Sequence, residues 1–310
     1  MAITAAMVKE LREITGAGMM DCKKALNKTE GNMDEAIEFL RKNGQAKAEK
    51  KAGRVAAEGL CSVKIEGNTA AMVEVNSETD FVAKNEVFQE FVASVASQVV
   101  KSNATTVEEL LEEDWNEDAS KKVKDALVDK IAVIGENLKI RRFVKVTSEN
   151  GCVVSYVHGG GRIASIIEAD TEVVNDEVKE ALLNIAMQVA ALNPKYISRE
   201  EISAEHIAHE KEILLAQIMN DPKESQKPEK VIKGIVEGRV NKELKEVCLV
   251  DQVYVKAEDG KQTVAKYLEE VSKKVGATVT VKKMVRFETG EGIEKKEEDF
   301  AAEVAAQLNA

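Results

Sequence analysis

The chain has 310 residues, enough for two domains with appendages, and its 4% aromatic content and three prolines favour helices over an all-β fold. Its net charge of −11 suits non-specific nucleic-acid binding poorly, because such binding depends on Lys and Arg, so no direct nucleic-acid partner is expected. The four scattered cysteines lack CxxC spacing, and no signal peptide or membrane-length apolar run is seen, which predicts a reduced, cytoplasmic protein without a membrane partner or a zinc site.

Residues 1–54 are predicted to form a three-helix domain followed by a linker. Apolar side chains recur at helical spacing from Val8 to Leu40, and the glycines of TGAGMMDC (15–22) mark the first turn. Such a unit buries little surface alone, so we expect a docking module. The basic run KNGQAKAEKKAGR (42–54) is interpreted as a solvated helical linker, with a local RNA-binding patch as the alternative.

The middle of the chain is duplicated. Residues 59–80 align without a gap on residues 151–172 at an offset of 92, which pairs Gly59 with Gly151 and Thr79 with Thr171. Each copy predicts a β-hairpin followed by a helix cap. Residues 123–146 align on 264–287 at an offset of 141, and each of these predicts a helix that ends at a glycine and is followed by a third strand.

The two offsets differ by 49, which places an insertion in the second copy at 193–246. Its two charged helices, separated by DPKESQKP (221–228), predict a projecting helical hairpin that is either a spacer or an arm for a partner or a second copy. The segment 101–122 receives no role.

The overall prediction is an α+β fold built around two modules. Each module is a three-stranded antiparallel sheet with helices on one face. The predicted boundaries are 1–54 for the head with its linker, 55–149 for the first module, 150–192 with 247–288 for the second, 193–246 for the hairpin and 289–310 for a C-terminal module.

No constellation of residues indicates an enzyme, and no cofactor is indicated. A Walker-type phosphate loop is not found. HGGGR (158–162) resembles oxyanion-hole glycines, but the chain has no G-x-S-x-G elbow to accompany it. Because HGGGR aligns with the hairpin turn of the first copy, a tight turn is the better interpretation.

The stretch SETDFVAKN (77–85) carries the most information about function. Thr79 is predicted to cap a helix. The apolar stripe that begins at Val87 matches the stripe that begins at Val178 at an offset of 91, so one residue has been gained or lost after the cap. Phe81 precedes this break. Periodicity leaves two alternatives open: the ring overhangs the edge of its module, or it packs the first helical turn onto the sheet.

Two long segments, VKELREITGAGMMDCKKAL (8–26) and EVNSETDFVAKN (74–85), resemble the elongation factor Ts family of bacteria, as does the tail VRFETGEGIEKKEEDFAAEV (285–304). The resemblance covers essentially the full chain. It implies a head like a ubiquitin-associated domain, a two-part core, a coiled-coil arm and a C-terminal module. It also implies a guanine-nucleotide exchange factor that binds elongation factor Tu, both GDP-bound and nucleotide-free, with a dimer of heterodimers as one assembly.

The resemblance further implies which residues meet the partner. The TDFV segment gives Asp80 and Phe81 the role of a wedge that disturbs the magnesium and phosphate region of elongation factor Tu, framed by Thr79 and Val82. The other implied contacts are Met19, Met20, Lys23 and His158. The turn after His158 has one glycine more than the family pattern, which alters its geometry. The alternative function is a non-catalytic adaptor that uses only the head.

Overall fold

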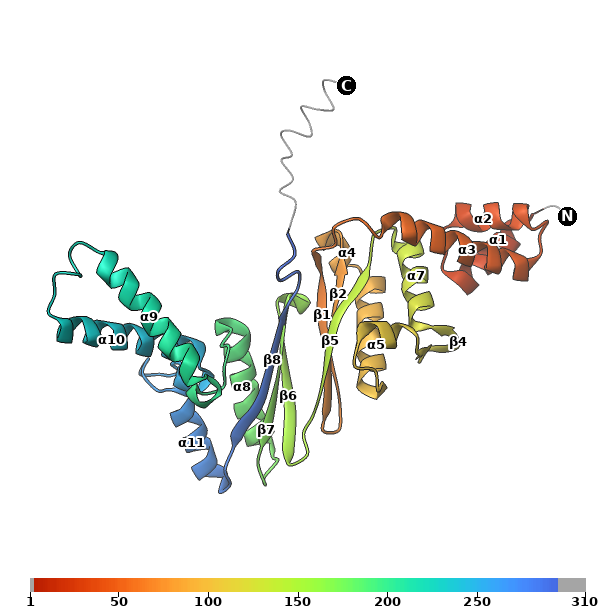
Figure 1. Ribbon diagram of the computed structural model, residues 1–310. Helices are drawn as coiled ribbons and strands as arrows, with labels where there is room; N and C mark the ends of the chain where they lie inside the picture. The colour runs from red at the N-terminus through yellow and green to blue at the C-terminus, as the bar shows by residue number, and fades with distance from the viewer. Residues whose placement is uncertain (1–2, 295–310) are drawn as a thin grey trace.

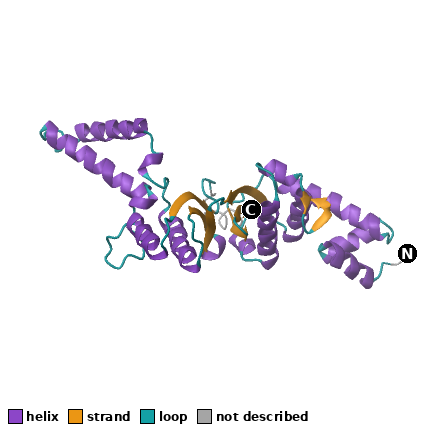
Figure 2. Cartoon of the chain, turned by 90° about the horizontal axis from the view of Figure 1, so that it is seen from below, coloured by secondary structure: helices purple, strands orange, loops and turns teal. Residues whose placement is uncertain are grey.

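The computed structural model describes residues 3–294, and its centre is a pair of three-stranded antiparallel sheets packed back to back (Figure 1, Figure 2). One sheet has the strand order β1-β2-β5 and the other β6-β7-β8. Apolar side chains from both sheets meet between them, including Met72, Val146, Ile166 and Phe287. Helices cover the two outer faces, and helical segments project from both ends (Figure 1). The predicted α+β fold with two three-stranded modules is confirmed.

The helices and strands follow one another in an order that repeats from one module to the next. The head contains α1 (Ala5–Thr15), α2 (Met19–Lys28) and α3 (Met33–Lys51). The first module contains β1 (Glu58–Glu66), β2 (Thr69–Ser77), α4 (Asp80–Ala83), α5 (Glu86–Lys101), α6 (Val107–Leu111), β3 (Asp114–Trp115), β4 (Asp118–Lys122), α7 (Val123–Ile134) and β5 (Lys139–Thr147). The second contains β6 (Gly151–His158), η1 (Gly159–Gly161), β7 (Ile163–Asp170), α8 (Asp176–Leu192), η2 (Arg199–Glu201), α9 (Ala204–Asn220), α10 (Glu229–Val247), η3 (Leu249–Asp251), α11 (Val264–Val275) and β8 (Thr280–Glu288).

The head is a three-helix unit whose last helix runs on into the first module. Leu11 and Leu26 are fully buried in its small core. Helix α3 continues through the basic run as far as Lys51, and its small residues Gly44 and Ala48 allow close packing against α7. The interpretation of 42–54 as a solvated linker is therefore wrong for one face, which is packed.

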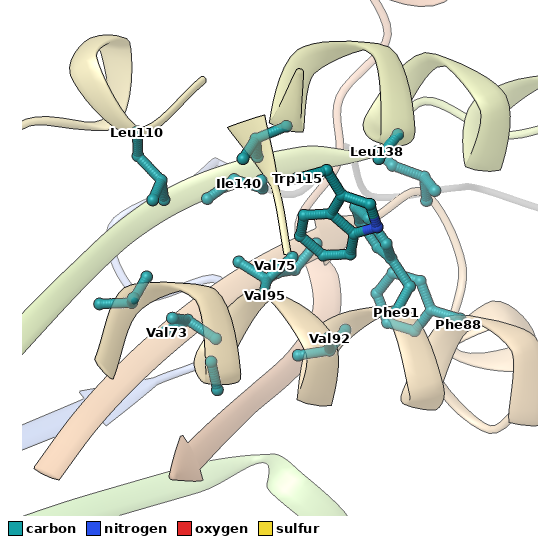
Figure 3. Packing of buried hydrophobic residues seen from close by; sticks show 14 of the residues in the cluster. Val73, Val75, Phe88, Phe91, Val92, Val95, Leu110, Trp115, Leu138 and Ile140 are labelled. Atoms are coloured by element: carbon teal, nitrogen blue, oxygen red, sulfur yellow. The ribbon is translucent and has the colours of Figure 1, made fainter. Parts of the chain in front are cut away.

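The core of the first module lies between its sheet and α5 (Figure 3). Phe88 and Phe91 of α5 are fully buried against the sheet. Trp115, from the short β3-β4 ribbon, places its ring centroid 6.0 Å from that of Phe91. Leu110 of α6 is also fully buried. The segment 101–122, which received no role, thus closes this core.

The gap-free alignment of the two hairpins is correct for the first strands and wrong for the second. Gly59 and Gly151 hold the same place, since a Cβ atom on either would lie about 2 Å from a carbonyl oxygen, that of Val75 (2.2 Å) or of Ala169 (2.1 Å). Those two carbonyl residues are 94 positions apart rather than 92. The reason is the turn, since the β6-β7 connection 159–162 is two residues longer than the β1-β2 connection 67–68.

The match between α5 and α8 also differs from the prediction. Their buried positions coincide at an offset of 90, which pairs Phe88 with Val178 and the buried Gln98 with Gln188. Val87, predicted to lie on the buried stripe, is exposed. The offset is 94 at the end of the hairpin and 90 from α5 onward. The first module therefore contains four additional residues between its hairpin and α5. The offset of 141 between α7 with β5 and α11 with β8 holds throughout, with Gly135 and Gly276 ending the two helices.

The four additional residues form α4. The hydroxyl of Ser77 donates to the carbonyl oxygen of Thr79 (3.0 Å), and that of Thr171 donates to the carbonyl oxygen of Val173 (3.3 Å). Thr79 therefore corresponds to Val173, and its predicted match with Thr171 is wrong. The helix caps Asn85 and Asn175 then correspond at the offset of 90. Asp80–Ala83 has no counterpart in the second module.

The inserted segment forms a helical hairpin, in which α9 and α10 lie side by side (Figure 1). Ile218, Ile232, Val236 and Val240 are buried between them. After β8, residues 289–294 fold back toward the first module, where the Gly290 N–H donates to Glu74 Oε1 at 2.8 Å. The remainder of the predicted C-terminal module, 295–310, lies outside the described residues.

Candidate functional site

The short helix α4 stands where β2 ends and carries the TDFV residues. Thr79 precedes it with an extended backbone, and its Oγ1 accepts the backbone N–H of Val82 at 3.4 Å, as expected of a helix cap. The helix ends at Ala83. Asn85 then caps α5 by accepting the Val87 N–H at 2.9 Å. The chain thus turns twice within a few residues and presents a single helical turn at the edge of the module.

Phe81 is 79% exposed, the most exposed large hydrophobic side chain among the described residues. Its neighbour Val82 is half-buried and packs on the module core, and Ala83 is buried. Phe88, by contrast, is fully buried. Of the two alternatives for Phe81, the ring overhangs the edge rather than packing onto the sheet. The only ring contact the structure gives it among residues 3–294 is the Lys84 ammonium, 5.9 Å from the centroid.

Asp80 sets a negative charge beside this exposed ring. Its carboxylate pairs with Lys84 Nζ at 2.7 Å across one helical turn. The hydrogen bond from Lys84 holds the pKa of the Asp80 carboxyl below its ordinary value, although the group is exposed. Asp80 is therefore ionised near neutral pH. An apolar ring flanked by a carboxylate and an ammonium is suited to enter a pocket that is apolar inside and polar at its rim.

The head presents a second exposed apolar group at the start of α2. Met19 is 57% and Met20 is 74% exposed, and Lys23 is exposed on the next turn. Neither methionine belongs to the core of the head. Thioether side chains adapt readily to an apolar partner surface. These residues can therefore provide a contact surface without disturbing the packing beneath them.

Two further apolar residues in this region are exposed, and neither was assigned to a partner contact from the sequence. Ile14 lies in the last turn of α1 and Val133 in the last turn of α7. The head and the first module meet here, because a Cβ on Gly16 would lie 3.6 Å from the Val133 side chain. For Val133, the duplication could have indicated exposure, because the corresponding position in the second module is Lys274.

His158 ends β6 and is exposed, with its Nδ1 3.0 Å from the Tyr156 hydroxyl. The three glycines that follow all have positive φ and form a short 3₁₀ turn into β7, so the tight-turn interpretation of HGGGR is confirmed. Gly161 lies against Leu60 and Cys61 of β1. The turn after His158 therefore stands at the end of the sandwich where β1 begins.

These positions lie along one edge of the molecule. Helix α4 contacts β1, the turn η1 contacts β1 as well, and α2 lies along the same upper edge in Figure 1. The edge offers exposed apolar and charged side chains for a large partner. Across residues 3–294 no group of three or more His, Cys, Asp or Glu side chains is placed to hold a metal ion. In the same residues, every helix is too short or too polar to cross a membrane.

Comparison with known proteins gives a consistent result. Residues 78–291 match the family model described as elongation factor TS. The chain is 53% identical over 309 residues to elongation factor Ts of Clostridium novyi and 51% identical over 308 residues to that of Clostridioides difficile. It is 48% identical over 309 residues to elongation factor Ts of Clostridium botulinum. Each of these alignments covers 99% of both chains.

Proposed function

The chain belongs to the elongation factor Ts family of translation elongation factors, and from this premise we propose that it is a guanine-nucleotide exchange factor for elongation factor Tu. It binds that partner and promotes the release of GDP during translation elongation, without catalytic side chains of its own. The observation that carries the proposal is the exposed ring of Phe81, 79% accessible on a helical turn that only the first module possesses.

The physical basis is reciprocal weakening of two ligands. A factor that binds the nucleotide-free partner more tightly than the GDP-bound one must weaken GDP binding by the same ratio. Burying one Phe side chain contributes roughly 1.5–3 kcal/mol, which is about ten- to a hundredfold in an equilibrium constant. Insertion of Phe81 beside the nucleotide and its magnesium ion, with Asp80 at the rim, would supply that difference. Thr79 caps the start of the turn, and Val82 packs the turn onto the module core.

The other exposed groups would provide contacts whose strength does not depend on whether elongation factor Tu holds a nucleotide. Met19, Met20 and Lys23 supply one contact on the head, and His158 supplies another on the β6-β7 turn. We propose the predicted boundaries as the functional domains, with 193–246 and 289–310 as appendages. Assembly as a dimer of heterodimers stays a prediction. A cytoplasmic location is proposed because the proposed function is in translation.

The test uses elongation factor Tu loaded with fluorescent GDP and an excess of unlabelled GDP to make release irreversible. Adding the full chain should accelerate the loss of fluorescence, and the rate should saturate with concentration. The matched control is the same chain with Val255→Ala, an exposed apolar residue in the loop between η3 and α11 that belongs to none of the proposed contacts, which should accelerate release equally. No acceleration by either protein would refute the exchange function and favour the adaptor that acts through the head alone.

A further inference from the structure

We propose that Glu136 is a positioning residue for the wedge: its carboxylate holds the turn that carries Phe81 in the exposed position before any partner arrives. The inference rests on the proposed exchange function and adds to it a residue outside the TDFV segment. Glu136 lies in the loop between α7 and β5, far from Phe81 in sequence.

The carboxylate of Glu136 accepts three hydrogen bonds from the turn before α4. Oε2 accepts the backbone N–H groups of Glu78 and Thr79, each at 3.0 Å, and Oε1 accepts the Thr79 hydroxyl at 2.6 Å. In return, the backbone N–H of Asn137 donates to Glu78 Oε1 at 2.5 Å. Hydrogen bonds to an ionised group are the strong ones in proteins. One side chain therefore fixes both the backbone and the capping residue of α4.

The second module supplies an internal comparison. Helix α11 ends at Gly276 in the same left-handed conformation as Gly135. The next residue is Ala277, which occupies the place of Glu136 at the offset of 141. That module builds the same helix, loop and strand with a methyl group there, and it also lacks α4. The carboxylate thus accompanies the four-residue insertion and is not required by the fold that the two modules share.

A single helical turn needs such support. Nucleating a helix is unfavourable, so the four residues of α4 have little stability of their own. If the turn were loose in the free protein, part of the binding free energy would be spent on ordering it. Fixing the backbone of one residue alone costs on the order of tenfold in an equilibrium constant. Glu136 removes this cost in advance.

The test compares Glu136→Ala with the unchanged chain in the GDP-release assay over a range of concentrations. We expect the maximal release rate to fall about tenfold, since at least one residue must then be ordered during release. The half-saturating concentration should change little, because Met19, Met20 and His158 still dock. Glu136→Gln should be intermediate, because its amide oxygen can still accept the two backbone N–H groups.

A matched control is available in the same module. Glu109 Oε2 accepts the N–H groups of Thr105 (2.7 Å) and Thr106 (3.2 Å) and the Thr105 hydroxyl (2.9 Å), the same set of bonds at the start of α6. Glu109→Ala should leave the maximal release rate unchanged. Equal losses from Glu109→Ala and Glu136→Ala would mean that general destabilisation is responsible, and would overturn the assignment.

Two further readouts separate this inference from the proposed function. In a Phe81→Ala background, Glu136→Ala should reduce the release rate no further, because it acts only through the ring; an additional loss would contradict the inference. Amide hydrogen exchange of residues 79–83 in the free protein should quicken with Glu136→Ala and not with Glu109→Ala. Unchanged exchange there would overturn the positioning role, even if the chain proved inactive on elongation factor Tu.

Discussion

Glu74 is a fully buried carboxylate on the middle strand of the first sheet, and it connects three parts of the chain. It pairs with Arg141 (2.9 Å) and Arg142 (2.5 Å) of β5 and accepts the Gly290 N–H from the segment after β8 (2.8 Å). The Arg142 guanidinium also lies 4.2 Å from the ring centroid of Phe287 on β8. The side chain therefore helps to fasten the second module onto the first.

We predict that Glu74 makes stability depend on pH. Burial raises its pKa, but the hydrogen bonds from Gly290, Asn76 and the two arginines outweigh burial and hold the pKa below the ordinary 4.5. A carboxyl group with a lowered pKa in the folded state stabilises that state above its unfolded pKa, and this contribution disappears as the pH falls through the folded value. The free energy of unfolding should therefore drop below pH 4.5.

The comparison variant is Glu74→Gln, followed by urea denaturation above and below that pH. At neutral pH it should cost roughly 3–5 kcal/mol, because two partly buried arginines lose their counter-charge. Below pH 4.5 the difference from the unchanged chain should shrink. A constant difference across the whole range would show that the charge of Glu74 is not what stabilises the fold.

Helix α4 shows, at the scale of elements, what the sequence could and could not predict. The offset of 141 was found correctly because α7 and α11 both pass into a strand through one glycine, which leaves no room for a gap. The hairpin offset of 92 was correct for the first strands and wrong for the second strands. Gly67 and Gly159 both follow a first strand, and their match concealed the different lengths of the two turns. Val87 and Phe88 are adjacent and both apolar, so periodicity could not decide which faces the core.

Removal of α4 is the prediction at this scale. Deleting residues 80–83 would join Thr79 to Lys84 and Asn85, just as Val173 is joined to Val174 and Asn175 in the second module. The protein should still fold and should lose about 1–3 kcal/mol, since of these residues only Val82 and Ala83 contact the core. Acceleration of GDP release should disappear. A deletion variant that fails to fold by circular dichroism would mean that α4 is part of the framework.

The molecule as a whole is a sandwich of two sheets, and this arrangement was not predicted from the sequence. Each module was expected to have helices on one face, and nothing was inferred about the other face. The middle strand β2 is buried on both faces along most of its length, because α5 covers one side and the second sheet covers the other. A strand whose inward and outward residues are both apolar was the available signal.

The back-to-back packing predicts that the two modules unfold together. Ile166 of β7 is 1% exposed and faces the first module, whereas Trp115, the single tryptophan of the chain, lies in the core of the first. Ile166→Ala should lower the urea midpoint reported by Trp115 fluorescence, with a cost of about 2–5 kcal/mol. Ile213→Ala is the exposed control. If Ile166→Ala left the urea midpoint reported by Trp115 fluorescence unchanged, the modules would be thermodynamically independent.

The central claim is that Phe81 acts outside its own fold, and the most direct measurement is the maximal rate of GDP release with Phe81→Ala, made beside its free energy of unfolding. The rate should fall about ten- to a hundredfold. The free energy of unfolding should stay within about 0.5 kcal/mol. Phe88→Ala, which leaves a cavity in the core, should instead lower the free energy of unfolding by about 3–5 kcal/mol. An unchanged release rate with Phe81→Ala would contradict the account.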